Sequence, residues 1–236
     1  ISMDYRRISL DRLTVQNTSA EYAEQVCRVV RRAFQVDMDE ECDDCMKPHH
    51  VAQQIERFPE GQFIAVHRED DGSNLVVGMA STMRIHRPPT EEALEWMEQL
   101  GDLGIKNHEP DGDWLYGVEM AVRAMYHRNG IGTQLYKARF QLVKDLNLRG
   151  WYAVGMLMGY ETYAEDMDVM TYGNKVILGE LVDPTVTMQM NRGFEAWEVV
   201  TDYIDEPVAG DAGVLIVWHN PDYQEVSPAQ KTAELE

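Results

Sequence analysis

Apolar positions along the chain follow two periods, one typical of strands and the other of helices. Runs of β-branched and alternating apolar residues predict strands at residues 8–17, 62–69, 74–87, 113–126, 151–158, 194–204 and 212–219. Apolar residues spaced three or four apart predict helices at 18–33, 48–58, 88–101, 130–148 and 183–193. The segment 159–182 combines helical spacing with glycines, so we expect an insertion with at least one helix. The order of these elements predicts an α/β fold.

Short local signals set the ends of several elements. Thr18 and Glu21 have the spacing of a capping box, in which two side chains satisfy backbone N–H groups at the start of a helix. Asp183 before Pro184 predicts an N-cap followed by proline at the first helical position. Asp-Gly at 71–72 predicts a hairpin that makes the second and third strands antiparallel neighbours.

The chain has 236 residues, 44% of them apolar, which is enough to bury one sizeable core. We expect a single domain over residues 1–223, with insertions near 87–112 and 159–182, and a polar tail over 224–236. No run approaches the roughly 20 apolar residues of a membrane helix, and the first residues lack the apolar centre of a secretion signal. The sequence therefore predicts a cytoplasmic protein without a membrane partner.

A net charge of −20, from 41 acidic against 21 basic residues, argues against a nucleic-acid partner because the phosphate backbone would be repelled. The acidity itself has two interpretations. It is compatible with a cationic substrate such as a polyamine or an amino sugar, and also with a solubilising or salt-adapted surface. The second interpretation is favoured, because net charge affects solubility and steering more than chemistry.

Three cysteines, Cys27, Cys42 and Cys45, are an odd number in a chain without an export signal, so we expect free thiols rather than a disulfide framework. Cys42 and Cys45 have the C-x-x-C spacing of zinc ligands, and His49 and His50 follow closely enough to complete a site. A single C-x-x-C without a distant second ligand pair is more often incidental. We therefore expect no metal, and keep a metal-dependent protein as a third hypothesis.

Two glycines, Gly130 and Gly132, stand between a predicted strand and a predicted helix in the stretch VRAMYHRNGIGTQLY (122–136). A helix N-terminus after a glycine loop can bind an anion, because the N–H groups of its first turn are unpaired and glycine lets the backbone come close. The stretch lacks the Gly-Lys-Ser/Thr ending of a P-loop, and Leu135 occupies the third glycine position of the dinucleotide fingerprint. From spacing alone, phosphate binding and a plain tight turn are equal alternatives.

The same stretch resembles the acetyl-coenzyme A signature of the GNAT (Gcn5-related) N-acetyltransferases, a Q/R-x-x-G-x-G/A loop that follows the fourth strand and opens the third helix. The frequent family pattern V-x-P-x-Y-R-G-x-G-I-G aligns without gaps on residues 122–132. Ala124 stands where proline is common, and His127 stands at the Q/R position with Arg128 one place later. The predicted order of elements also matches the family's layout over nearly the whole chain.

The resemblance implies the GNAT fold, a central, mostly antiparallel mixed sheet of about seven strands flanked by helices, and acetyl-CoA as co-substrate. In that family the fourth strand binds the pantetheine arm and the thioester carbonyl through its backbone, which here implies Met120, Ala121 and Val122. The glycine loop binds the pyrophosphate mostly through N–H groups, which implies His127, Arg128, Asn129, Gly130, Ile131, Gly132 and Thr133. By resemblance, a homodimer is compatible with the sequence.

Glu119 is the candidate general base, because an acidic residue on the fourth strand often serves in the family. Amine acetylation needs a neutral amine, so a base must take the ammonium proton. A carboxyl group needs burial to act near neutral pH. If its side chain points away from the cleft, Glu119 is instead a solvated or paired carboxylate, and the sequence leaves both alternatives open.

Gln189 stands where many family members have a tyrosine that acts as general acid. Glutamine cannot protonate a thiolate, so either another tyrosine substitutes or the thiolate leaves unassisted. The tyrosines nearest in sequence are Tyr160, Tyr163 and Tyr172, for which packing is the simpler role. The acceptor pocket is expected between the first two helices and the two insertions, near the acidic residues and histidines Glu161, Glu165, Asp166, Asp168, His49 and His50.

Three further stretches, at 58–63, 182–194 and 216–223, resemble the GNAT domain that precedes a carbon–nitrogen hydrolase domain in some bacterial proteins. Only residues 224–236 follow, so we expect no hydrolase domain in this sequence. The leading hypothesis is an acetyl-CoA-dependent N-acetyltransferase acting on the primary amine of a small, cationic substrate by direct attack in a ternary complex. The alternative is a non-catalytic acyl-CoA-binding sensor or scaffold, which the missing tyrosine motivates.

Overall fold

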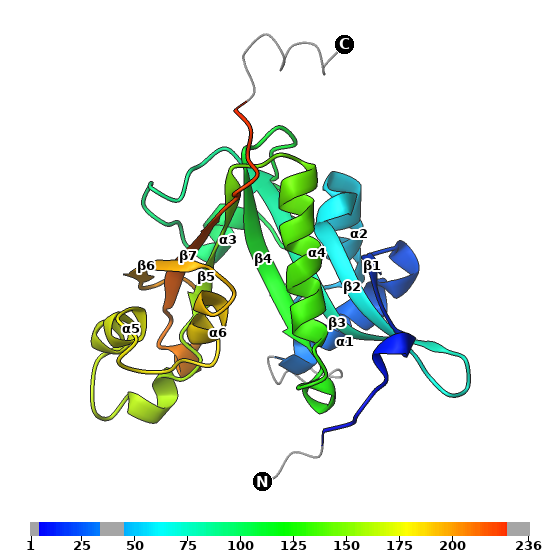
Figure 1. Ribbon diagram of the computed structural model, residues 1–236, viewed down its shortest axis with the longest axis horizontal. Coiled ribbons are helices and arrows are strands. Elements are labelled where there is room, and N and C mark those ends of the chain that lie inside the picture. The colour runs from blue at the N-terminus through cyan, green and yellow to red at the C-terminus, as the bar shows by residue number, and fades with distance from the viewer. Residues whose placement is uncertain (1–4, 34–44, 226–236) are drawn as a thin grey trace.

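A seven-stranded sheet runs through the molecule in the order β1-β2-β3-β4-β5-β7-β6 (Figure 1). The computed structural model describes residues 5–33 and 45–225. The strands are β1 Leu13–Asn17, β2 Gln62–Arg68, β3 Asn74–Ile85, β4 Trp114–Val122, β5 Gly150–Met156, β6 Glu195–Val200 and β7 Gly213–His219. Neighbouring strands are antiparallel except β4 and β5, which are parallel. The predicted fold class, a mostly antiparallel mixed sheet flanked by helices, is confirmed.

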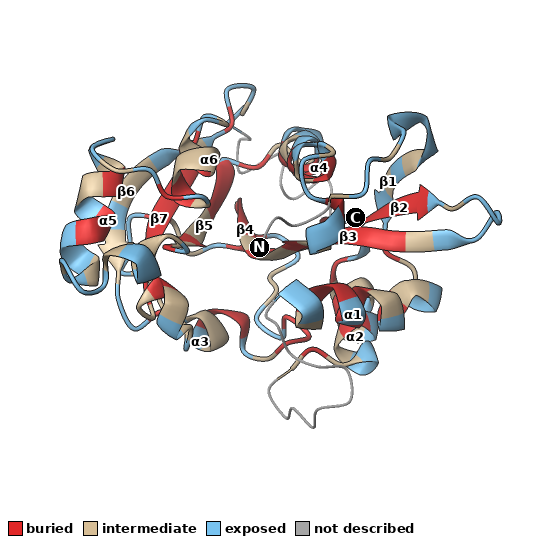
Figure 2. Ribbon diagram, turned by 90° about the horizontal axis from the view of Figure 1, so that it is seen from below, coloured by how far each residue is buried: buried red, intermediate tan, exposed pale blue. Residues whose placement is uncertain are grey.

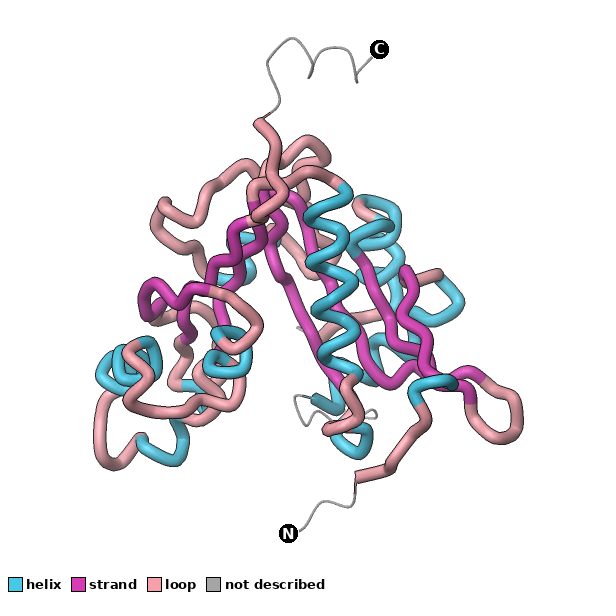
Figure 3. Tube along the Cα trace, in the orientation of Figure 1, coloured by secondary structure: helices cyan, strands magenta, loops and turns pink. Residues whose placement is uncertain are grey.

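Helices cover both faces of this sheet. They are α1 Ala23–Ala33, α2 Pro48–Arg57, α3 Trp96–Leu100, α4 Ile131–Asp145, α5 Val169–Ile177 and α6 Val186–Met190. Figure 2 shows α4 and α6 on one face and α1, α2 and α3 on the other, with the buried residues between the layers. Figure 3 shows the same layers by secondary structure, with α4 running along the central strands. No helix among the described residues is long and apolar enough to cross a membrane.

The two central strands separate half-way along their length. β4 and β5 pair only from Trp114 to Tyr116 and from Gly150 to Tyr152, and Figure 1 shows them diverging below that point. Beyond the paired part, four residues of β4 are partly exposed although the strand lies in the middle of the sheet: Gly117, Glu119, Met120 and Val122. The divergence therefore opens the sheet and leaves backbone N–H and C=O groups of β4 without a strand partner.

Two predictions near the N-terminus are wrong in detail. Residues 10–12 form a 3-10 turn, so the first strand begins only at Leu13. Thr18 does not cap a helix: its side chain is buried, and its N–H donates to Gln62 O (2.9 Å). A second 3-10 turn follows Ser19 and leads into α1, so the chain turns before the helix starts and the capping box does not form.

Two helices differ from their predicted bounds. The inserted helix predicted at 88–101 is only α3, five residues long, although Gly101 ends it as predicted, with φ 76°. Thr185 rather than Asp183 is the N-cap residue of α6. Asp183 still serves the helix start, because its Oδ1 accepts from the N–H groups of Thr185 (2.8 Å) and Val186 (2.9 Å).

Asp183→Ala should lower the free energy of unfolding by about 3 kcal/mol, which corresponds to a melting temperature lower by about 6–12 °C. The carboxylate is fully buried, and its Oδ2 also accepts from Gly159 N (2.9 Å) and Tyr172 Oη (3.1 Å). Truncation leaves these buried donors without a partner. Thermal denaturation measures the effect, with the exposed Asp166→Ala as control; equal melting temperatures for the two variants would contradict it.

The cysteines differ from the prediction of three free thiols. Cys45 is in a disulfide, whereas Cys27 is free and buried, and burial raises the pKa of its thiol to about 11. An odd number of cysteines is compatible with one disulfide, so the count alone did not fix the oxidation state. Cys42 lies outside the described residues. Within the described ranges, no group of three or more His, Cys, Asp or Glu side chains could hold a metal ion.

Candidate active site

A β-bulge shapes the opening on the β4 side. Gly117 and Glu119 pair with consecutive residues of β3, which leaves Val118 as the extra residue. Trp96 Nε1 of α3 donates to Val118 O (3.1 Å). The carbonyl group of the bulged residue is therefore hydrogen-bonded to the helical layer that contains α3. The bulge lies directly beyond the last β4–β5 pair, and it changes the face of the sheet to which the following side chains point.

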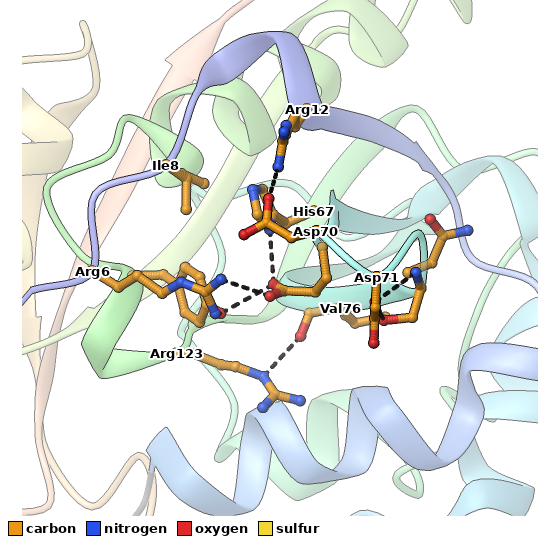
Figure 4. Close-up of polar contacts among 12 residues, drawn as sticks. Arg6, Ile8, Arg12, His67, Asp70, Asp71, Val76 and Arg123 are labelled. Carbon is orange, nitrogen blue, oxygen red and sulfur yellow. Dashed lines mark hydrogen bonds and ion pairs between the residues drawn. The ribbon is translucent and has the colours of Figure 1, made fainter.

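Beyond the bulge, backbone groups of β4 alternate between β3 and the opening. Arg123 N–H donates to Val77 O of β3 (2.9 Å). Figure 4 shows the second bond, from Arg123 Nε to Val76 O (2.8 Å). Because successive residues of a strand direct their backbone groups to opposite edges, those of Ala121 also point to β3. Ala121, one of the three residues predicted to bind the pantetheine arm, therefore lacks free backbone groups at the opening.

The other two predicted residues do face the opening. Met120 N–H donates to Glu119 Oε1 (2.8 Å) rather than to a strand. Val122 O accepts from His127 Nε2 (2.9 Å), and the exposed imidazole of His127 thus folds back on the strand end. Met120 and Val122 present an N–H and a C=O that only side chains satisfy, so a ligand can compete for both.

Glu119 points to the face of the sheet that carries α1, α2 and α3. Alternation places it on the same face as Ala121, which packs in the cluster around α1. Burial raises the pKa of its carboxyl group to about 7, and the hydrogen bond from Met120 N–H partly opposes the rise. The side chain is nevertheless partly exposed at the opening. A carboxyl group with this pKa can exchange a proton near neutral pH, as a general base requires.

The loop before α4 leaves three backbone donors free. Gly130 is the N-cap residue in the left-handed conformation (φ 76°, ψ 5°), which glycine adopts without strain. The first helical hydrogen bond runs from Gln134 N to Gly130 O (3.1 Å), so Ile131, Gly132 and Thr133 have no intrahelical partner for their N–H groups. These donors and the dipole of the 15-residue helix have the arrangement of an anion site.

Other residues of the loop hold its conformation. Asn129 Nδ2 donates to Arg6 O (2.8 Å) and to His127 O (3.2 Å), and its Oδ1 accepts from Ile8 N (3.2 Å). Arg128 has φ 61°, uncommon for a residue with a side chain. The structure thus directs the Asn129 side chain toward the N-terminal segment, whereas the N–H groups of residues 131–133 stay open.

A polar cluster ties this loop to the β2–β3 hairpin (Figure 4). Arg6 donates from Nη1 to Tyr126 Oη (2.9 Å) and from Nη2 to Glu69 Oε2 (2.6 Å). His67 Nδ1 lies 2.9 Å from Glu69 Oε1, and the hydrogen bonds with His67 and then Arg6 lower the pKa of Glu69. Sequence reasoning missed this cluster because its members come from three distant segments.

Arg192, at the end of α6, is a site residue that the sequence did not reveal. Its Nη2 donates to Thr133 Oγ1 (3.2 Å), and its guanidinium lies 4.8 Å from the ring centroid of Tyr136. The side chain is partly exposed and forms no ion pair with a carboxylate in the described part of the chain. It therefore adds a positive charge beside the first turn of α4, where an anion would bind.

Arg192→Ala should weaken coenzyme A binding about tenfold, because a hydrogen bond to a charged group contributes about 1.5–3 kcal/mol. Calorimetric titration at low and high salt measures the loss, which should shrink as salt screens the charge. Arg28→Ala, an exposed arginine on α1, serves as control and should bind as tightly as wild type. An Arg192→Ala affinity equal to that of the control would remove Arg192 from the site.

On the Glu119 side, two tyrosines and a tryptophan close the site. Trp96 N donates to Tyr203 O (2.8 Å), and the hydroxyl groups of Tyr203 and Tyr116 are 2.7 Å apart. Burial raises the pKa of both phenols well above the usual range, and the carboxylates of Glu119 and Glu95 add to the rise at Tyr203. These hydroxyl groups therefore remain protonated at neutral pH, close to the candidate base.

The acidic residues predicted for the acceptor pocket do not converge on Glu119. Figure 1 shows the insertion with α5 beside β6, away from β4. Asp168 is the N-cap of α5 and accepts from Thr171 N (2.8 Å), while the other three, Glu161, Glu165 and Asp166, are exposed. Acidic residues closer to Tyr203 lie in its own loop and were not singled out from the sequence: Asp202, Asp205, Glu206 and Asp211.

The three tyrosines of the insertion are engaged in packing. Tyr172 is fully buried and donates to Asp183, Tyr160 Oη donates to Met167 O (3.2 Å), and the rings of Tyr163 and Tyr172 lie 5.1 Å apart. His50 Nδ1 accepts from Lys47 N (3.1 Å) in the first turn of α2. None of these groups is held toward Glu119.

Comparison with known proteins identifies the family. Residues 24–158, more than half of the chain, match the family described as "Acetyltransferase (GNAT) family". The chain belongs to the GNAT family. This confirms the family predicted from the glycine loop, together with its enzyme class, N-acetyltransferases of EC 2.3.1, which use acyl-CoA.

Two curated proteins of Bacillus subtilis (strain 168) are similar to this GNAT chain. "Probable hydrolase YhcX" is 32% identical over 80% of the chain, but the chain spans only 36% of YhcX. "Uncharacterized N-acetyltransferase YkwB" is 26% identical over 91% of the chain and 92% of that protein. The match to part of YhcX agrees with the predicted resemblance to GNAT domains attached to hydrolases.

Solved structures show the same GNAT fold. The chain superposes on the GphF GNAT-like decarboxylase in complex with isobutyryl-CoA with a TM-score of 0.71 at 14% identity, over 88% of this chain and 99% of that one. The loading GNATL domain of CurA from Lyngbya majuscula gives 0.71 at 17% identity, over 88% and 98%. At these identities the likeness supports the fold alone.

Proposed function

We propose that the protein is an acetyl-CoA-dependent N-acetyltransferase that acetylates the primary amine of a small, cationic substrate by direct attack in a ternary complex. The observation that carries the proposal is the position of Glu119. Its carboxyl group has a pKa raised to about 7 and lies at the unpaired half of β4. The carboxyl group faces the helical layer of α1, α2 and α3, on the other side of the sheet from α4. The acyl donor and the amine acceptor therefore approach the sheet from different sides.

The residues on the α4 side fit an acyl-CoA. The three free N–H groups of residues 131–133, with Arg192 beside them, suit a pyrophosphate. Met120 N–H suits the thioester carbonyl and Val122 O suits an amide N–H of the pantetheine arm, since both point into the opening. Among the predicted residues, Gly130, Ile131, Gly132, Thr133, Met120 and Val122 therefore remain candidate ligands, whereas Asn129 holds the loop.

Glu119 has two linked tasks in this proposal. Its Oε1 now accepts from Met120 N–H, the donor that we expect to bind the thioester carbonyl. When that carbonyl takes over the N–H group, the carboxylate loses this partner and is free to take a proton from the ammonium form of the acceptor. The neutral amine then attacks the thioester carbon, while Met120 N–H stabilises the negative charge that develops on the carbonyl oxygen.

The acceptor side favours a positively charged substrate. Glu119 and Glu95 both act electrostatically on Tyr203, and the loop of Tyr203 adds further acidic residues. A second ammonium group on the substrate would be attracted to this region, and the partly exposed aromatic ring of Trp96 offers a further contact for a cation.

A screen of primary amines with acetyl-CoA tests the proposal. It includes monoamines, diamines, polyamines and amino sugars, and it follows the release of free CoA thiol. We expect saturable release with at least one diamine, polyamine or amino sugar. Binding of acetyl-CoA without release for any amine would overturn the enzyme proposal.

A second candidate function follows from one observation. Gln189 replaces the general-acid tyrosine of many family members, which favours a non-catalytic acyl-CoA sensor or scaffold. Such a protein would bind acetyl-CoA and CoA but would give no turnover in the screen.

A further inference from the structure

We propose that Arg139 and Tyr136 of α4 form a site for the departing thiolate of CoA, in which a buried positive charge takes the place of the proton donor missing at Gln189. The proposal rests on the proposed function and concerns the leaving-group side of the same reaction. Six residues from four elements carry it: Arg139, Tyr136, Gln189, Arg192, Trp151 and Met120.

Arg139 is a buried cation without an anion. The side chain is only 3% exposed, and no ion pair joins it to a carboxylate among the described residues. Nε donates to Leu135 O (3.3 Å) and Nη2 contacts Met120 Sδ (2.7 Å). Burial lowers the pKa of the guanidinium to about 10, so it stays charged at neutral pH. A buried charge is normally paired, so this one points to an anionic partner that binds later.

Aromatic rings hold the guanidinium in place. It lies 4.3 Å from the ring centroid of Trp151 and 4.5 Å from that of Tyr136. Cation–π contacts stabilise the charge in part, but they use the faces of the guanidinium and not its N–H groups. A side-chain hydrogen bond with Tyr136 also favours the charged form of Arg139.

Gln189 is hydrogen-bonded to the tyrosine hydroxyl next to this cation. Its Nε2 donates to Tyr136 Oη (3.2 Å), and its Oε1 is buried without a hydrogen-bond partner among the described residues. Gln189 is 8% exposed and packs against Gly155 of β5, where any larger residue would collide with Oε1. The amide thus fixes the Tyr136 oxygen as an acceptor and leaves its O–H proton for another group.

A buried donor without a hydrogen-bond partner in the described structure lies on β5, in the part that pairs with β4. Trp151 Nε1 has no partner in the described part of the chain. A Cβ added at Gly117, the first residue of β4 beyond the paired part, would lie 2.9 Å from Trp151 Nε1 and 3.1 Å from Ala153 Cβ. The indole of Trp151 therefore packs directly against Gly117, where no side chain would fit.

Met120 connects this cluster to the expected position of the thioester. Its N–H faces the opening, where we expect the thioester carbonyl, and its sulfur touches Arg139. Glu119 and Met120 point to opposite faces of β4, so the base and the cationic cluster flank the same backbone position from the two sides. The charged group that faces the cluster is Arg192, which follows α6 and is also positive. The other neighbours, Gln189 of α6 and Trp151 of β5, are neutral.

The step balances without a protein proton on sulfur. Glu119 takes one proton from the ammonium group, and the neutral nitrogen then forms a bond to the carbonyl carbon. The second proton, which leaves the nitrogen as the adduct becomes an amide, passes to solvent. The carbon–sulfur bond breaks and its electron pair stays on sulfur. The resulting thiolate is stabilised by the charge of Arg139 and by a hydrogen bond from Tyr136 O–H, and it takes a proton from solvent after CoA leaves.

The acidity of bound CoA tests this directly. The ultraviolet absorption of the thiolate is titrated in the complex of CoA with wild type, Arg139→Met and Tyr136→Phe. In wild type we expect the thiol pKa to be lowered by about one unit or more relative to free CoA, and in Arg139→Met to return to within about 0.3 units of it. Tyr136→Phe removes one hydroxyl group and should give an intermediate value.

Lys137→Met is the matched control for this titration. It removes an exposed cation from the same helix and should leave the thiol pKa as in wild type. An unshifted thiol pKa in wild type, or the same shift in Arg139→Met and wild type, would overturn the thiolate site while the proposed function stands. If Arg139→Met does not fold, Tyr136→Phe decides: a thiol pKa identical to wild type overturns the proposal. Absence of CoA binding in wild type would instead remove the proposed function.

Discussion

Glu119→Gln should lower the turnover number for the amine substrate by about 10²–10⁴-fold, while the affinity for acetyl-CoA stays unchanged. Glutamine keeps the size of the side chain and can still meet the N–H group of Met120, but it cannot take a proton from an ammonium ion. Steady-state kinetics with an amine from the screen measure the turnover, and calorimetric titration measures the affinity.

The pH dependence of wild type should report the same group. The base must be deprotonated, and its pKa is raised to about 7 by burial, so the rate should rise with pH through about 7 and then level off. The folded protein holds this proton more tightly than the unfolded chain does. Ionised Glu119 therefore opposes folding at pH values above both pKa values, and Glu119→Gln should melt no lower than wild type at pH 8.

Glu98→Gln is the matched control for this prediction. Glu98 is an exposed acid in α3, in the same layer of the molecule, and its carboxyl group caps no backbone group in the described structure. Its replacement should leave turnover and the pH profile as in wild type. If Glu119→Gln retains wild-type turnover, or if its loss is matched by Glu98→Gln, Glu119 is not the base.

Gly130→Trp should weaken acetyl-CoA binding by more than about 100-fold. A Cβ on Gly130 meets no protein atom within 4 Å, so the indole would extend into the space beside the free N–H groups of the α4 N-terminus. A pyrophosphate there would lose its donors, and hydrogen bonds to charged groups contribute about 1.5–3 kcal/mol each. Calorimetric titration with acetyl-CoA and with CoA measures the loss.

Gly179→Trp separates this effect from backbone strain. Gly179 also has a positive φ (74°), and a Cβ there also meets nothing within 4 Å, but it follows α5, which packs against the edge strand β6. Both variants carry the cost of a side chain in the left-handed region, about 1–2 kcal/mol. Equal affinities of the two variants for acetyl-CoA would show that the glycine loop does not bind it.

The elements around the candidate site that were predicted correctly lie close together in the sequence. The strand, glycine loop and helix around Gly130 occupy one continuous stretch, and their order alone determines that N–H groups of the first helical turn are exposed. Alternating apolar residues likewise predicted the strands, because sheet faces repeat every second residue. The direction of the Glu119 side chain depends on a bulge, which the pattern does not reveal.

The missed residues are brought together only by the fold. Arg192 meets Thr133, and Gln189 meets Tyr136, across more than 50 positions of sequence. In the sequence, Gln189 indicates only a missing proton donor, because its partner on another helix is not visible there. Gln189 also packs against a glycine of β5. The reason for a glycine at that position can be seen only when the distance between α6 and β5 is known.

A crystal structure of the protein with CoA tests the central claim most directly. We predict pyrophosphate oxygens within hydrogen-bond distance of the N–H groups of Ile131, Gly132 and Thr133. The pantetheine arm should lie along the unpaired half of β4, with its sulfur beside the cluster of Arg139 and Tyr136. Coenzyme A bound elsewhere on the chain, or with its pyrophosphate away from the start of α4, would contradict the proposed site.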